Sequence, residues 1–409
     1  MTPLAEALAL VLDRCPRRPP SEVPLADALG TVLARAVEAS EAVPPFDNSA
    51  MDGFAVRCSD TRGATPDRPV TLRVVATLAA GAAPDRAVEP GEAVRIMTGA
   101  PMPVGADAIV MVERTKPAGD GQVHIEVEVP DGLHVRRIGG DIAAGAEVLP
   151  VGTILGPAHL GVAASVGSRR LTVHPSLRVG VLSTGDELVE GDEPLRPGQI
   201  RESNRPMLLA LVRRAGCEPI DLGLVADDEA GLTDALRHGA STCDALITSG
   251  GVSMGDFDVV RTVLDRIAAM TWLQIAIKPA KPFAFGIIDG TPVFGLPGNP
   301  VSSLVSFELL ARPALRHMMG HEHLDRPRLT GQAAAELRRT EDGRVHYMRV
   351  HARWSDGVVL AMPVIGQGSH QLAASAGANA LAVVPDGDGV PVGGAVDLLL
   401  LGDLETAPA

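Results

Sequence analysis

The clearest pattern of hydrophobic and polar positions lies between residues 177 and 322, where short apolar runs alternate with amphipathic segments. Apolar runs with the length of a buried strand cover residues 178–183, 219–225, 244–248 and 271–277. Helical periodicity covers residues 205–215, 227–240, 258–268 and 299–319. Strands that alternate with helices are typical of parallel βαβ units. This part of the chain therefore predicts a central α/β domain with an open parallel sheet.

The segments on either side follow other patterns. Residues 4–37 have helical periodicity with breaks at 15–20 and at Gly30, and a glycine-rich mixed stretch covers residues 134–175. Between them, β-type runs stand at 70–78, 93–97, 108–113 and 123–129. After residue 325, further β runs stand at 329–337, 345–353, 358–364, 380–384 and 395–401. They predict a small, barrel-like C-terminal β domain.

The expected fold is therefore multidomain α/β plus β, with four parts. They are an N-terminal mixed α+β domain for linkage and dimerisation (1–45 and 139–176), an inserted β-rich domain (46–138), the α/β domain (177–322) and the C-terminal β domain (323–409). The N-terminal stretches are too short to bury a core each, which predicts pairing with a second copy as a homodimer.

Composition narrows the function classes. The chain has 409 residues, and 36 Lys+Arg against 50 Asp+Glu give a net charge of −14. Such an acidic balance argues against a general nucleic-acid or membrane-surface binder, which needs an excess of basic residues. With Phe 7, Trp 2 and Tyr 1, aromatic platforms that stack bases are not expected. The cores must be mainly aliphatic, and a local basic pocket for a small anion remains open.

The cysteines and the N-terminus predict a cytoplasmic protein. The 4 cysteines lie far apart in sequence, without zinc-ligand spacing, which is typical of thiols in a reducing compartment. The first twenty residues read as an amphipathic helix interrupted by Glu6 and Asp13, not as a signal peptide. No apolar run approaches the ~20 residues of a membrane span.

Open α/β folds bind ligands at the carboxyl ends of their strands, which points to the loops after residues 183, 225, 248 and 277. Four loops carry candidate chemistry: three follow the strands that end at 183, 248 and 277, and the fourth opens the helix predicted at 299–319. Small and polar residues stand in the first, second and fourth of them: Ser183, Thr184, Gly185 and Glu187; Gly250, Gly251, Ser253, Asp256 and Asp258; Asn299 and Ser302. The paired glycines let backbone N–H groups approach a ligand, and Asp256 or Asp258 either caps a helix or binds a metal. In the third loop, Lys278 and Lys281 stand beside prolines, which is more typical of an anion site than of solvated surface charge. For Asn299 and Ser302, a well-capped helix start and an anion site stay equally open.

Taken together, several segments resemble the molybdopterin molybdenumtransferase family (MoeA in bacteria, the gephyrin E-domain type in animals). The matching segments are PPFDNSAMDGFA, RIMTGAPMPVGADAIV, VRRIGGDI, VLSTGDELV, TSGGVSMGDFD, IKPAKPFAFG, FGLPGNPVSS and GQGSH, between Pro44 and His370. The resemblance implies a MogA-like molybdopterin-binding central domain, an elongated homodimer with the site in a cleft between subunits, and Mg²⁺. It implies an enzyme that inserts molybdate into adenylylated molybdopterin and releases AMP. Transient contacts with the adenylyltransferase and with molybdoenzymes follow from that role.

Carried over by motif, the resemblance assigns residues to three groups. The active cleft receives Asp52, Thr98, Asp141, Glu187, Asp227 and Asp258, and the Mg²⁺ ligands are expected among Glu187, Asp227, Asp256 and Asp258. The residues assigned to molybdate binding are Lys278, Lys281, Ser302, Arg349 and Ser369. The residues assigned to binding of the pterin and its nucleotide are Ser183, Thr184, Gly185, Gly250, Gly251, Ser253 and Asn299. Ala280 stands where glycine is usual, so that loop has less backbone freedom.

Two other function classes stay open on the sequence. One is a molybdopterin adenylyltransferase, which the α/β domain resembles; the large N-terminal half weighs against it. The other is a non-catalytic scaffold of the gephyrin kind; the full set of Asp and Lys residues weighs against it.

Overall fold

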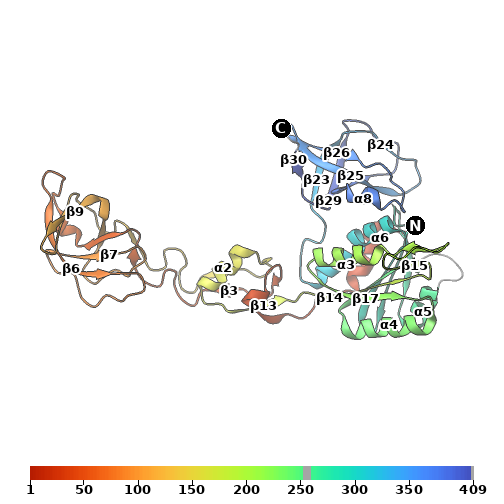
Figure 1. Ribbon diagram of the computed structural model, residues 1–409, viewed down its shortest axis with the longest axis horizontal. Coiled ribbons are helices and arrows are strands. Elements are labelled where there is room, and N and C mark those ends of the chain that lie inside the picture. The colour runs from red at the N-terminus through yellow and green to blue at the C-terminus, as the bar shows by residue number, and fades with distance from the viewer. Residues whose placement is uncertain (252–258, 407–409) are drawn as a thin grey trace. The chain divides into compact units, whose positions relative to one another are not determined.

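The structure, a computed structural model, describes residues 1–251 and 259–406. It divides the chain into two compact units (Figure 1). The first unit consists of Met1–Ser21, Gly30–Ala34 and Val173–Ala409, and the second of Glu22–Leu29 and Arg35–Thr172. The finer division into four domains stays a prediction.

A six-stranded sheet forms the centre of the first unit. Its strand order is β17 (Glu218–Val225), β14 (Arg178–Thr184), β18 (Ala245–Ser249), β22 (Thr291–Leu296), β21 (Pro282–Ile288) and β19 (Thr271–Gln274). The first four strands are parallel, which confirms the α/β prediction. β21 is antiparallel to both of its neighbours.

The antiparallel strand arises from a hairpin that the sequence prediction missed. Asp289 and Gly290 connect β21 to β22 with φ angles of 48° and 88°. A two-residue Asp-Gly turn with both φ angles positive matches the twist of a β-hairpin. The chain therefore returns directly along its own strand, without the helix that a parallel connection requires.

Helices cover both faces of this sheet (Figure 1). On one face, α4 (Glu229–Thr242) and α5 (Val259–Ile267) pack on Leu182 and Leu246. On the other face, four helices pack on Val181 and Ile247: α1 (Leu4–Asp13), α3 (Asn204–Arg214), α6 (Pro300–Ser306) and α7 (Arg312–Met318). Consecutive residues of each strand thus serve opposite faces. A π-helical segment, η4 (Phe307–Ala311), joins α6 to α7, so the predicted helix over 299–319 is confirmed with one wider turn. Among the described residues, no helix combines the length and the apolar character needed to cross a membrane.

A closed five-stranded barrel follows, as predicted. Its strands are β23 (Arg328–Ala333), β25 (Val345–Ser355), β26 (Val358–Pro363), β27 (Ala380–Val384) and β29 (Ala395–Leu400), and pairing of β25 with β27 closes it. A short parallel pairing of β20 (Ile277–Lys278) with β25 attaches the lysine loop of the α/β domain to the barrel. The minor pairs are β24 (Leu337–Arg338) with β28 (Gly389–Val390), and β30 (Glu405–Thr406) with β25.

The second unit is built mainly on another six-stranded sheet. Its order is β8 (Ala108–Met111), β5 (Gly53–Val56), β7 (Glu92–Ile96), β6 (Val70–Leu78), β10 (Gln122–Ile125) and β9 (Thr115–Gly119). The four β runs predicted for this stretch are confirmed. The short pairs β3 (Val37–Glu38) with β12 (Glu147–Leu149) and β4 (Asn48–Ser49) with β11 (Val135–Arg136) also belong to this unit, as does α2 (Pro157–Ser165).

The helical prediction for residues 4–37 is correct only as far as Asp13. After it the chain forms β1 (Ser21–Pro24), a 3-10 turn η1 (Leu25–Asp27), and β2 (Val32–Leu33). Prolines and Gly30 in this stretch prevent a continuous helix, so the apolar residues there are buried from short extended segments instead. Leu33 is fully buried in this way.

Candidate functional site

Five loops meet at one edge of the central sheet. The parallel strands β14, β17, β18 and β22 all end there, at Thr184, Val225, Ser249 and Leu296. Because β21 runs in the opposite direction, it begins at this edge, where Pro282 pairs with the last residue of β19. The lysine loop between β19 and β21 therefore joins the loops that the sequence placed at the ligand-binding edge.

Glycines bring the backbones of three of these loops into direct contact. Gly250 N donates to the carbonyl oxygen of Leu296 at 3.1 Å. Gly250 has a φ of +100°, and a β-carbon on it would lie 3.1 Å from the carbonyl oxygen of Thr184. From α3, Asn204 Nδ2 donates to Ser249 Oγ at 2.8 Å and to the carbonyl oxygen of Gly298 at 2.7 Å. The floor of the edge is thus largely backbone, which suits close approach by a ligand.

Buried polar atoms without partners lie next to this floor. Among the described residues, Ser183 Oγ, Thr248 Oγ1 and Asn204 Oδ1 are buried and have no hydrogen-bond partner. Most buried polar groups in folded proteins are paired, so such orphans call for an explanation. A polar ligand at this edge would provide the missing partners.

Carboxylates lie on the outer side of the same edge. Asp186 Oδ1 accepts a hydrogen bond from Asp227 N at 3.2 Å, which brings the loops after β14 and β17 together. Glu187 folds back over Gly185, where a β-carbon would lie 2.6 Å from Glu187 Oε2. The cap of α4 is Asp228, whose carboxylate accepts from Gly231 N at 2.7 Å, so Asp227 is not occupied as the cap.

Two predicted metal ligands and one predicted cofactor-binding residue belong to the segment 252–258. Asp256, Asp258 and Ser253 lie outside the described residues. Within residues 1–251 and 259–406, no group of three or more His, Cys, Asp or Glu side chains gathers around one point. The magnesium assignment therefore stays a prediction, and Asp186, which directly precedes Glu187, is a further carboxylate of the same loop.

The lysine loop presents two exposed ammonium groups from a fixed backbone. Lys278 pairs with His346 in the β20–β25 register, and Lys281 O accepts from Ile275 N at 2.7 Å. Ala280 is buried and has a φ of +76°, a conformation that favours glycine. The alanine at this position therefore strains the backbone of the loop locally. Lys278 Nζ lies 3.7 Å from Asp342 Oδ2.

Arg349 is completely enclosed by the loop between β26 and α8 (Ala373–Ala376). Its guanidinium donates to the carbonyl oxygens of Gln371 (2.7 Å), Gly366 (2.6 Å) and Gly368 (3.1 Å) and to Ser375 Oγ (3.1 Å). The side chain is buried, and burial lowers the pKa of Arg349. Since these four bonds use its terminal nitrogens, Arg349 shapes the loop and adds a positive charge beneath it.

That loop also touches the start of α6. Val301 N donates to the carbonyl oxygen of Ser369 at 3.1 Å, so Ser369 and the buried Ser302 come from neighbouring segments. Asn299 stands at the helix cap position as expected, but its side chain makes no capping hydrogen bond. It is exposed at the edge instead.

In the second unit, two predicted site residues are joined. Asp52 Oδ1 accepts from Thr98 N at 2.7 Å and from Thr98 Oγ1 at 2.8 Å. These bonds, first the backbone one, lower the pKa of Asp52 and keep it ionised. Asp141 is exposed, and its amide donates to Val43 O at 3.0 Å. The role of these three residues in the active cleft stays a prediction.

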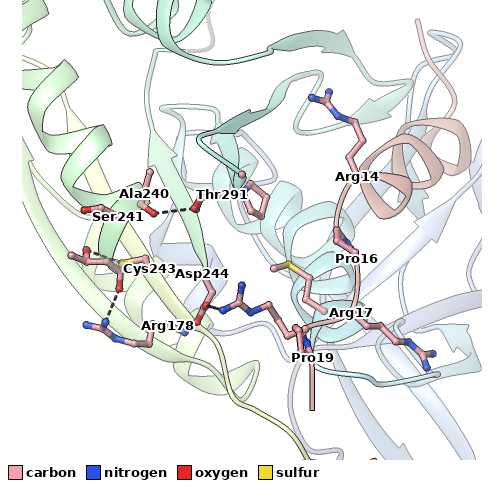
Figure 2. A pocket seen from close by; sticks show the side chains of 15 residues that line it. Arg14, Pro16, Arg17, Pro19, Arg178, Ala240, Ser241, Cys243, Asp244 and Thr291 are labelled. Atoms are coloured by element: carbon pink, nitrogen blue, oxygen red, sulfur yellow. Dashed lines mark hydrogen bonds and ion pairs between the residues drawn. The ribbon is translucent and has the colours of Figure 1, made fainter. Parts of the chain in front are cut away.

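A separate cavity of about 440 Å³ lies at the opposite, amino-terminal edge of the sheet (Figure 2). Arg14, Arg17, Arg18 and Arg178 line it together with Asp244. The helices α1, α4 and α7 end here, and helix carboxyl ends attract cations. Arg178 Nη1 binds the last carbonyl oxygen of α4 at 2.6 Å, and Arg18 binds Asp244 at 2.6 Å. In Figure 2, Arg14, Arg17 and Arg178 point to different sides, so their guanidinium groups do not converge on one point of the cavity.

The family to which this α/β domain is similar indicates the class of the protein. Residues 180–317 match the family described as "Probable molybdopterin binding domain". Residues 2–167 match "MoeA N-terminal region (domain I and II)", and residues 332–401 match "MoeA C-terminal region (domain IV)".

Similar proteins extend the match over nearly the whole chain. Molybdopterin molybdenumtransferase 2 of Mycobacterium tuberculosis is 43% identical over 373 residues, which cover 90% of this chain and 91% of that protein. Molybdopterin molybdenumtransferase of Haemophilus influenzae is 37% identical, with 94% of each chain covered. A crystal structure of the molybdopterin biosynthesis MoeA protein from Pyrococcus horikoshii superposes with a TM-score of 0.82 at 30% identity, covering 98% of this chain and 100% of that one. The chain belongs to the molybdopterin molybdenumtransferase family.

Proposed function

We propose that the protein is a transferase of molybdenum cofactor biosynthesis, which inserts molybdate into adenylylated molybdopterin and releases AMP. The observation that carries the proposal is the identity of 43% with a protein named molybdopterin molybdenumtransferase, over 91% of that protein's length. An adenylyltransferase alone would need only the α/β domain, whereas this likeness extends through both flanking regions.

In this proposal, molybdate binds where the lysine loop, the start of α6 and the Arg349 loop approach one another. Lys278 and Lys281 supply mobile positive charge, and Ser302 and Ser369 supply hydroxyl donors. Arg349 contributes through the loop that it holds and through its buried charge, for which no carboxylate partner exists among the described residues. A dianion is thereby attracted without direct contact with that guanidinium.

The phosphates of the adenylylated substrate would lie over the glycine-rich floor. Ser183, Thr184, Gly185, Gly250, Gly251, Ser253 and Asn299 are the residues that we assign to them. The hydroxyl of Ser183, which has no partner among the described residues, is a suitable donor for an anionic oxygen. In this proposal, the phosphoanhydride and molybdate bind at the same edge of the sheet. Their proximity couples the release of AMP to the binding of molybdate.

We also propose Mg²⁺ as the resident metal, held by some of Glu187, Asp227, Asp256 and Asp258. The donors fit the ion, because Mg²⁺ prefers carboxylate oxygens and usually takes one or two of them together with substrate phosphates and water. A ready-made cage of three or more side chains is therefore not required. When bound, the ion would neutralise charge on the departing phosphate.

We further propose a cytoplasmic homodimer in which Asp52, Thr98 and Asp141 complete the cleft. Phe46 and Ile138 are exposed large apolar residues of the second unit, 45% and 57% accessible. They flank the ion pair between Arg137 and Asp47, whose nitrogen and oxygen are 2.8 Å apart. Apolar exposure around a polar pair is typical of an association surface. Light scattering that gives the mass of one chain at micromolar concentration would exclude the dimer.

The direct test is to incubate the purified protein with adenylylated molybdopterin, Mg²⁺ and molybdate and to follow AMP. We expect AMP to appear only when molybdate is present, together with cofactor that reconstitutes an apo-molybdoenzyme. Consumption of ATP with unmodified molybdopterin would instead indicate the adenylyltransferase, and absence of both activities would indicate a scaffold.

A further inference from the structure

Asp342 is surrounded by basic side chains at the junction of the lysine loop and the barrel. Its carboxylate lies 2.5 Å from Arg344 Nη2, 3.1 Å from His346 Nε2, 3.2 Å from Arg339 Nη2 and 3.7 Å from Lys278 Nζ. The hydrogen bond from Arg344 is the largest cause that holds the pKa of Asp342 far below its usual range. The carboxylate is therefore ionised at any pH at which the enzyme would work.

The segment that carries Asp342 is itself firmly anchored. Arg339 has a fully buried side chain, and its Nη1 donates to the carbonyl oxygens of Arg344 and Pro385 at 2.8 and 2.7 Å. Asp386 binds the other end of Arg339 and accepts from the amides of Asp342 (3.2 Å) and Gly343 (3.0 Å). The position of the Asp342 carboxylate is thus set by the barrel.

Lys278 is anchored only through its backbone. The β20–β25 pairing fixes its α-carbon opposite His346, but its side chain is 50% exposed and has four rotatable bonds. Ordering a lysine side chain costs free energy that binding must otherwise supply. Among the described residues, Asp342 is the acid paired with this ammonium.

We propose that Asp342 is a positioning residue for oxyanion binding, which holds the ammonium of Lys278 at the edge of the site in advance of molybdate. The inference rests on the proposed function of Lys278. Asp342 does not compete strongly with the oxyanion, because Arg344 and Arg339 lie closer to its carboxylate and Lys278 is its most distant partner. A half-exposed ion pair is weak, so a dianion can take over the ammonium that the pair has oriented.

Asp342→Asn is the test, because it removes the charge with little change of shape. We expect a KM for molybdate raised about threefold at unchanged kcat, the effect of losing one exposed ion pair. Measurements at high salt suppress the opposite, long-range effect of added positive charge. Glu336→Gln is the matched control, since it removes an acid of the same barrel that pairs with the exposed Arg338 and contacts neither Asp342 nor Lys278; it is expected to leave KM unchanged.

The background variant Lys278→Ala separates the possible failures. In that background, Asp342→Asn is expected to have no further effect on KM. The inference alone is wrong if Lys278→Ala raises KM but Asp342→Asn leaves it unchanged or lowers it. It is also wrong if the control Glu336→Gln raises KM equally, or if Asp342→Asn still changes KM in the absence of Lys278. A Lys278→Ala protein with the wild-type KM would instead remove the proposed role of Lys278 itself, and the inference with it.

Discussion

Replacement of Arg349 by lysine tests whether the planar guanidinium, and not only its charge, holds the loop between β26 and α8. The guanidinium makes four hydrogen bonds of 2.6–3.1 Å from two nitrogens that face different parts of the loop. A lysine keeps the charge but offers one nitrogen, which cannot occupy both positions. If two charge-assisted bonds are lost at roughly 1.5 kcal/mol each, the unfolding free energy falls by about 3 kcal/mol. At 2–4 °C per kcal/mol, this lowers the melting temperature by about 6–12 °C.

The assay is thermal unfolding followed by circular dichroism, with molybdate-dependent AMP release measured on the same samples at a temperature where both proteins are folded. Arg353→Lys is the control, since Arg353 lies on the same strand β25 but is exposed, and it should melt within about 1 °C of wild type. We expect Arg349→Lys also to raise the KM for molybdate, because Ser369 is carried by the loop that loosens. A protein that melts together with the control and turns over normally would show that the four bonds do not hold the loop.

Further predictions concern single positions. Lys281→Ala should leave the melting temperature unchanged but weaken molybdate affinity about tenfold to a hundredfold, the value of a charge-assisted contact; an unchanged affinity would make this lysine an ordinary surface charge. Asp258→Asn should keep its stability but lose most Mg²⁺-dependent AMP release, and normal turnover at limiting Mg²⁺ would contradict its metal role. Burial lowers the pKa of His321 to about 4 from an unfolded value of 6.5, so stability is lost as pH falls between these values, by about 2 kcal/mol at pH 5; urea unfolding of His321→Asn should lack this loss, and an unchanged pH dependence would refute it. Gly251→Ala should destabilise more than Gly191→Ala by about 1–3 kcal/mol, since both have positive φ but only the first β-carbon would collide with α5, at 2.1 Å; equal melting temperatures would argue against that collision.

The sequence predicted best where its pattern and its chemistry agreed. Strands such as 219–225 and 380–384 were found because buried apolar runs have few alternatives in a soluble domain. The ligand edge could be predicted because parallel strands necessarily end together, even without knowledge of which residues touch.

Other features could not be predicted because they depend on distant partners or on short turns. The strands β21 and β22 and the Asp289-Gly290 turn between them were missed, although two apolar runs joined by an Asp-Gly pair are a hairpin signal. The segment after Asp13 was read as helical from its apolar spacing, but prolines overrode that pattern. The enclosure of Arg349 and the position of Asp342 depend on loops from elsewhere in the barrel, which no local pattern reveals.

The hairpin turn at Asp289-Gly290 has a practical consequence for anyone who wishes to modify the enzyme. Because β21 starts at the ligand edge and β22 ends there, this turn lies at the far end of the sheet, beside the cavity of Figure 2. A fluorophore or affinity tag inserted between the two residues would be separated from the substrates by the length of the sheet. Since both flanking strands are buried in the sheet, such a label would report on the unfolding of the α/β core from the edge opposite the proposed ligand site.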